Sequence, residues 1–217
     1  MKKLVVAVIF CFIQFNAHAQ DTEIFAAVQT GNPFSSENSD GVYLNYSFGI
    51  EQYFIKKLSL AISYRKTFNL SDNEYNLNEF YYNGYFYTYK EENSSFAIDL
   101  ESKYFFDSSE EGWYMSSGIS YQSLKMTMDV TIADYYSGVA PAPPVPAGTY
   151  TESHSIFPLS LKAGHRNSGD VIVFDYYFGV AFNLGSGDVK HTYQDYLQYD
   201  SFNSVSFILG LKMGFKL

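Results

Sequence analysis

The chain has 217 residues and a formal net charge of −9, and 19% of its residues are aromatic. This acidic balance excludes nucleic-acid binding through phosphate neutralisation, and the abundance of Tyr and Phe excludes a disordered chain. The single cysteine excludes an internal disulfide.

The first residues have the pattern of a secretory signal peptide. Lys2 and Lys3 precede an apolar run over 4–15, and a small-x-small tripeptide follows at 17–19. An apolar run of about 12 residues is shorter than the roughly 20 that a membrane-spanning helix needs. We therefore expect a cleaved signal over 1–19 and one mature domain over 20–217. The cysteine lies inside the signal, so the mature domain would hold no thiol for a metal.

Apolar and polar residues alternate along the whole mature domain, which predicts β-strands with one apolar face each. In the last strand, Val205, Phe207 and Leu209 alternate with Ser206 and Gly210. In another, 113–130, the apolar set changes parity between Tyr121 and Leu124, and a β-bulge would explain the change. The eight predicted strands are 22–33, 42–54, 58–70, 95–106, 113–130, 156–166, 172–183 and 205–217.

The connections between these strands are alternately long and short, which is typical of outer-membrane barrels. The short connections are 56–57, 107–112 and 167–170. The longer ones are 35–41, 71–94, 131–155 and 186–204. This alternation predicts an antiparallel up-and-down transmembrane barrel with both termini in the periplasm and the longer loops outside.

One face of the predicted strands is small or charged and the other is aromatic or aliphatic. In a membrane barrel the first face lines the interior and the second meets lipid. Eight strands leave an interior that side chains fill, so we expect a salt-bridged core rather than an ion pathway. The predicted interior charges are Glu51, Arg65, Asp99, Glu101, Lys103, Lys162, Arg166, Asp175 and Lys212.

With these features the chain resembles the small outer-membrane β-barrel family of the OmpA/OmpX type. The resemblance covers 20–217 and rests on the signal, the alternating strands and the final segment Leu209–Leu217. It implies that the outer-membrane assembly machinery reads the last strand. Many family members end in Phe, whereas this chain ends in Leu217 with Phe215 two positions earlier. The family shares no catalytic residues, so none is carried over.

The connection 71–94 is rich in tyrosine and holds an Asn-Gly pair between aromatic residues, which is a strong hairpin signal. We interpret it as a ribbon in which the third and fourth strands continue above the membrane. Two alternatives are an aromatic fringe at the lipopolysaccharide level and a ten-stranded barrel that includes the hairpin. The candidate partner-binding residues are Tyr81, Tyr82, Tyr85, Phe86, Tyr87 and Tyr89.

The sequence favours a non-enzymatic, monomeric outer-membrane protein without cofactor or metal. Its expected contacts are membrane lipid, lipopolysaccharide and an extracellular ligand or surface polymer, with a role in surface integrity, adhesion or partner binding. One alternative is lateral passage of small apolar molecules along small positions such as Gly210 and Gly214. The other is a lipid-modifying hydrolase. The residues considered for a hydrolase are His154 with Ser153 or Ser155, His165 with Ser168, and Asp188 with His191.

Overall fold

A computed structural model describes residues 21–31, 43–69, 78–82, 85–107, 110–135, 147–184 and 205–217. The predicted signal over 1–19 lies outside these residues, as do the loops 35–41 and 186–204. None of the described residues forms a helix long and apolar enough to cross a membrane.

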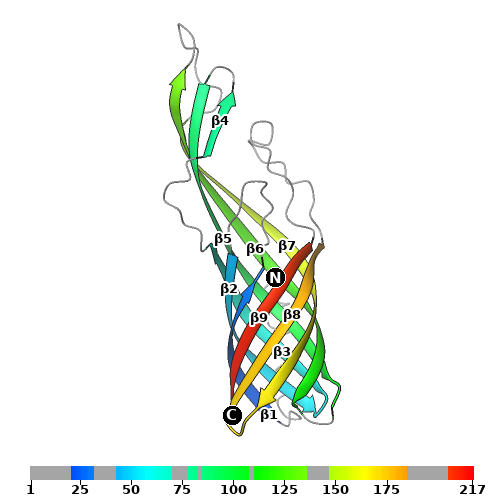
Figure 1. The fold of residues 1–217 in the computed structure, drawn as a ribbon. Helices are drawn as coiled ribbons and strands as arrows, with labels where there is room; N and C mark the ends of the chain where they lie inside the picture. The colour runs from blue at the N-terminus through cyan, green and yellow to red at the C-terminus, as the bar shows by residue number, and fades with distance from the viewer. Residues whose placement is uncertain are drawn as a thin grey trace, which may run out of the picture.

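Nine strands account for almost all of the described chain (Figure 1). Eight of them close into an antiparallel barrel in the ring order β3-β2-β1-β9-β8-β7-β6-β5, because β3 also pairs with β5. The ninth, β4, pairs only with β5 and lies outside the ring, so the ten-stranded alternative is wrong. The strands are β1 Asp21–Thr30, β2 Tyr43–Ile55, β3 Leu58–Asn69, β4 Asn78–Tyr82, β5 Tyr85–Phe105, β6 Gly112–Tyr135, β7 Gly148–Ser168, β8 Ile172–Leu184 and β9 Val205–Lys216.

Both ends of the barrel domain lie at the same end of the barrel (Figure 1). β1 begins where β9 finishes, with Glu23 opposite Lys216, and the Leu217 amide donates to the Thr22 carbonyl at 2.9 Å. The short connections 56–57, 106–111 and 169–171 lie at that end too.

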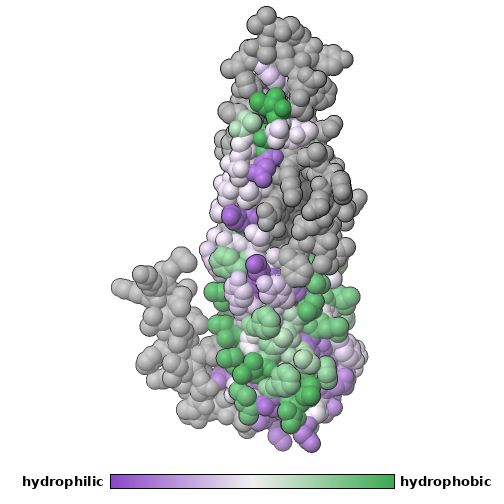
Figure 2. Space-filling view, turned by 90° about the vertical axis from the view of Figure 1, so that its left-hand side faces the viewer, coloured by the Kyte–Doolittle hydropathy of each residue, from purple (hydrophilic) through white to green (hydrophobic). Residues whose placement is uncertain are grey.

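The wall is apolar outside and polar inside. Along β9, exposed positions alternate with covered ones, and Phe207 and Leu211 keep 80% and 67% of their surface exposed. On β5, β6 and β7 the outward-facing apolar and aromatic residues that are exposed or half-buried fall within 96–104, 113–121 and 157–165. Each range covers about nine residues, which is enough for a tilted strand to cross a bilayer. Figure 2 shows part of this apolar band with hydrophilic residues above and below it.

The bulge predicted between Tyr121 and Leu124 is absent, and that prediction is wrong. β6 keeps one register with β5 from Tyr114 to Ile132, and one register with β7 over its paired length. Leu124 points inward and is 0% exposed. The parity of apolar residues changes because β6 leaves the lipid at this level, so its outer face becomes polar while its inner face becomes apolar.

Above the barrel, β5, β6 and β7 continue as a sheet (Figure 1). We call the parts of these three strands that lie beyond the apolar band, together with β4, the extension. β8 ends at Leu184, opposite Phe157, so among the described strands only β6 pairs with β7 over 148–156. The extension includes the predicted hairpin, in which Tyr82 pairs with Tyr85 across two residues. The other arm of this hairpin is β4, a separate strand, and not a continuation of β3 as we had predicted.

Candidate functional site

The barrel interior holds all nine charged residues that the sequence placed there. Glu51, Lys103, Arg166, Asp175 and Lys212 are buried in the half of the barrel near the termini. Arg65, Asp99, Glu101 and Lys162 lie nearer the extension, where each keeps between 11% and 19% of its side chain exposed.

Glu51 is the centre of the lower cluster. Its carboxylate accepts from Lys103 Nζ at 3.1 Å and also from Lys212 and Ser59. Lys103 Nζ donates as well to Asp175 Oδ2 at 2.6 Å, and Lys212 Nζ lies 3.8 Å from the same oxygen. Two lysines are therefore shared between two carboxylates inside the wall.

The structure adds Glu23, which the sequence reasoning missed. Its carboxylate lies 2.7 Å from Arg166 Nη2 and 3.0 Å from Lys212 Nζ. β1 carries apolar residues on both faces here, Ile24 outward and Phe25 inward, so its alternation was weak. Register with Glu51 across the β1–β2 pair is the signal that could have found Glu23. With it, five carboxylates balance five cations.

The upper interior is held by two separate ion pairs and a chain of hydrogen bonds. Arg65 binds Asp99 through two bonds of 2.9 and 3.1 Å, and Lys162 Nζ donates to Glu101 at 2.6 Å. The hydrogen-bond chain links four strands, from β6 to β2, with the residue that follows β1. In it, Gln122 donates to Ser95, Ser95 to Thr67, Thr67 to Asn45, and Asn45 to the Gly31 carbonyl.

Aromatic rings fill the space around the lower charges. Lys212 Nζ lies 4.0 Å from the centre of the Phe25 ring, and the Arg166 guanidinium lies 4.7 Å from that of Tyr53. Glycines make room for such groups: a Cβ at Gly210 would overlap the Tyr177 ring, and one at Gly214 would overlap Glu23. These two small positions therefore face occupied interior space.

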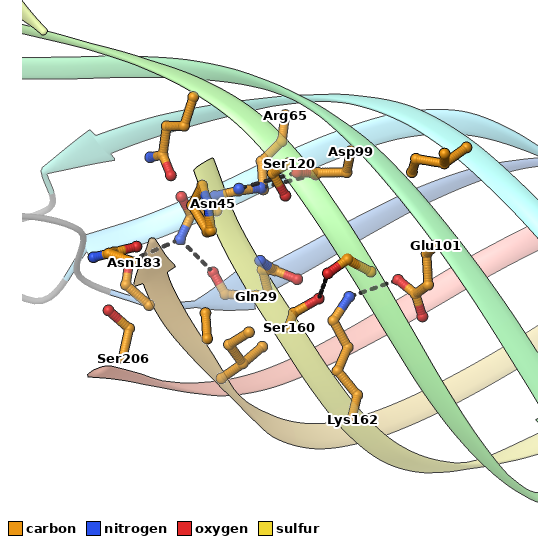
Figure 3. A pocket seen from close by; sticks show the side chains of 17 residues that line it. Gln29, Asn45, Arg65, Asp99, Glu101, Ser120, Ser160, Lys162, Asn183 and Ser206 are labelled. Atoms are coloured by element: carbon orange, nitrogen blue, oxygen red, sulfur yellow. Dashed lines mark hydrogen bonds and ion pairs between the residues drawn. The ribbon is translucent and has the colours of Figure 1, made fainter. Parts of the chain in front are cut away.

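Two small cavities remain between these layers. The upper one has a volume of about 50 Å³ and is lined by both upper ion pairs (Figure 3). The lower one, about 30 Å³, lies between those pairs and the Glu51 cluster. A water molecule needs roughly 10–15 Å³ of such volume, so each cavity has room for a few waters.

Outside the membrane-spanning segments, the described part of the chain holds one carboxyl whose pKa is shifted, that of Glu110. Burial in the short turn 106–111 raises the pKa of Glu110, and the nearby Asp21 raises this pKa further.

The candidate partner-binding residues lie on the β4–β5 hairpin. Tyr82 is opposite Tyr85 and Tyr81 is opposite Phe86, and further along the hairpin Tyr87 is opposite Phe80 and Tyr89 is opposite Asn78. Of these six side chains the structure describes that of Tyr85, which is 4% exposed.

Of the histidine arrangements considered for hydrolysis, the described residues test His165 with Ser168, and these two side chains do not come together. His165 faces outward, stacked on Tyr176 at 5.3 Å and against Trp113 at 5.1 Å, whereas Ser168 lies on the inner face. Ser155 pairs with the Tyr121 hydroxyl at 3.0 Å. The His154 side chain, Asp188 and His191 lie outside the described part. No group of His, Cys, Asp or Glu within that part could hold a metal ion.

No family model and no curated protein sequence matches the chain. Among solved structures it is similar to the N-terminal β-barrel domain of Pseudomonas aeruginosa OprF, with a TM-score of 0.47, 11% identity and coverage of 92% of this chain and 98% of that one. It is also similar to Ail, the attachment invasion locus protein of Yersinia pestis, with a TM-score of 0.47, 8% identity and coverage of 91% of this chain and 97% of that one. For Neisserial surface protein A the TM-score is 0.45 and the identity 12%, and the match covers 91% of this chain and 96% of that one.

The closed ring, the exposed apolar band and the charged interior together make this chain an eight-stranded β-barrel of the outer-membrane type.

Proposed function

We propose that this chain is a non-enzymatic, monomeric surface protein of the bacterial outer membrane, whose barrel anchors the extension and whose extension binds a partner outside the cell. The observation that carries the proposal is the continuation of β5, β6 and β7 beyond the apolar band. A strand needs only about 9–11 residues to cross the bilayer, so the additional length serves something above it.

The surface of the extension supports an aqueous location. Thr127, Asp129, Thr149 and Thr151 lie on the outward face of β6 and β7 in the extension, and the Thr149 hydroxyl donates to Asp129 at 2.6 Å. The start of β1, the end of β9 and all three short turns lie at the opposite end of the barrel. Short turns in such barrels face the periplasm, which supports periplasmic termini and an extension outside.

The interior supports an anchor rather than a passage. Ion pairs and rings occupy its lower half, and the space at Gly210 and Gly214 is taken by Tyr177 and Glu23. Lateral passage along these glycines would require both side chains to leave. The separation of His165 from Ser168 equally disfavours a hydrolase.

The β4–β5 hairpin is our proposed binding element, with a surface polymer or a matrix protein as partner. Cells that display the full chain should adhere to surfaces coated with matrix protein or purified surface polysaccharide. The double variant Y81S/F86S should lose this adhesion, because it removes two aromatic rings from positions that are paired across the hairpin. The matched control K56Q/K57Q changes the turn at the other end. Unchanged adhesion of Y81S/F86S at equal surface display would refute the proposal.

A further inference from the structure

Among the side chains that the structure describes, the outer wall of the barrel carries exposed cations on one flank only. Lys66 on β3 and Lys125 on β6 are both exposed and point outward. The other cations with described side chains either point into the barrel or, like Lys56 and Lys57, lie at the end where β1 begins. On β1, β8 and β9, at the level of Lys66 and Lys125, the described residues that face outward are uncharged.

The strand register places these two lysines close together at the edge of the apolar band. Lys66 is opposite Phe96, which is opposite Ser123, and Lys125 is opposite Ser94. With two strand spacings between them and a step of two residues along the strand, their Cα atoms lie about 12 Å apart. Two long lysine side chains at this separation can each bind one anion of the same molecule. Ser94 and Ser123 offer hydroxyls between them.

Aromatic and then aliphatic residues continue this flank towards the middle of the membrane. Tyr64 stacks on Phe96 with ring centres 6.3 Å apart, and Tyr121 lies on the same level of β6, across Ile98. Further down, the exposed residues are Leu100 and Ile119. From the extension downwards the order is cation and hydroxyl, aromatic ring, aliphatic side chain. That is the order of phosphate, sugar and acyl chain in a glycolipid.

We propose that this flank of β3, β5 and β6 binds a glycolipid that carries two phosphates, with Lys66 and Lys125 each holding one. A phospholipid with a single phosphate and no sugar, such as phosphatidylglycerol, would leave one of the two cations without an anion. The inference rests on the proposed function in one respect, because it requires the glycolipid-bearing outer leaflet to lie at the extension end.

The test is lipid retention by the purified full mature chain, measured by native mass spectrometry. The probes are a bis-phosphorylated lipid A-type glycolipid, the same glycolipid without phosphates, and phosphatidylglycerol. A lysine near an anionic surface contributes to the free energy of binding. Each single Gln variant should therefore retain the first probe about fivefold less than the unchanged chain, and K66Q/K125Q about thirtyfold less. K66R/K125R should retain it, since arginine also binds phosphate. The matched control K56Q/K57Q removes the same charge from the other end and should change nothing.

Several outcomes would overturn the proposal. One is that K66Q/K125Q retains the bis-phosphorylated glycolipid as well as the unchanged chain does. Another is that the unchanged chain retains phosphatidylglycerol as well as this glycolipid. The third is that K56Q/K57Q loses as much of the glycolipid as K66Q/K125Q does. Circular dichroism confirms that each variant is folded. Retention by the purified protein does not depend on adhesion, so a failure here leaves the hairpin's proposed role standing. Conversely, loss of that role leaves retention unchanged.

Discussion

The lower and upper halves of β6 share one strand and one register, yet their faces have opposite chemistry. Below Tyr121 the outer face carries Trp113, Met115 and Ile119, whereas above it the outer face carries Ser123, Lys125 and Thr127. The inner face changes the other way, from Ser116 and Ser120 below to Leu124 and Val130 above. The solvent around each half, lipid or water, therefore decides which face is apolar, and burial alone does not.

The largest expected effect concerns the buried charges of the lower half. The variant E51Q removes one of the two carboxylates that Lys103 and Lys212 share and leaves them only Asp175 in common. Removing one partner of a buried ion pair costs about 3–5 kcal/mol, so the free energy of unfolding in lipid vesicles should fall by that amount. The control E111Q changes an exposed turn residue and should be neutral. A loss below about 1 kcal/mol for E51Q would show that the interior is well hydrated.

The next effect separates the two halves directly on β7. Leu161 lies at the middle of the apolar range 157–165, and Thr151 lies on the same outward face in the extension. An arginine at the bilayer midplane costs about 2–4 kcal/mol, so L161R should be destabilised by this amount while T151R is unchanged. Urea titration in vesicles measures both. Equal costs would mean that both positions meet the same solvent.

A smaller effect tests how tightly the interior is packed. In G210A the new methyl group overlaps the Tyr177 ring, and overpacking of this kind costs about 1–3 kcal/mol. In a Y177L background the same change should cost less, since the ring has gone, and the difference gives the coupling between the two positions. An equal cost in both backgrounds would place the strain elsewhere.

The smallest effect is a pH dependence in the short turn 106–111. Burial and the nearby Asp21 raise the pKa of Glu110 in the fold, Glu23 raises it further and Lys216 lowers it, so the ionised form of Glu110 opposes folding. The variant E110Q should therefore be more stable than the unchanged chain above that raised pKa, by less than about 1 kcal/mol at such a partly exposed site. The gain should vanish as the pH falls below the ordinary carboxyl range. In a D21N background it should shrink, and a gain that persisted at low pH would contradict this account.

The sequence predicted the barrel well because the membrane imposes alternation on every strand. Strand number, strand order and the inward placement of Glu51, Lys103 and Lys212 all follow from that period of two. Glu23 was missed because Phe25 puts an apolar ring on the inner face of β1, which only the three-dimensional packing around Lys212 explains. The change of parity at Tyr121 was assigned to a bulge, since one sequence does not reveal where lipid gives way to water.

The upper end of the molecule was harder to predict for a related reason. The Asn-Gly signal located the hairpin, because the turn depends on local backbone conformation. Its pairing with β6, and the burial of Tyr85, depend on contacts between distant parts of the chain. Periodicity along a single strand carries no information about these contacts.

The most direct test of the inversion between lipid and water is a spin-label scan along the outer face of β6. Single cysteines at Met115, Ile119, Thr127 and Thr131 can each carry a label, since the mature domain is expected to contain no other thiol. In vesicles, we predict that labels at Met115 and Ile119 collide mainly with dissolved oxygen, and labels at Thr127 and Thr131 mainly with a water-soluble nickel complex. Similar accessibility to the nickel complex at all four positions would contradict the account.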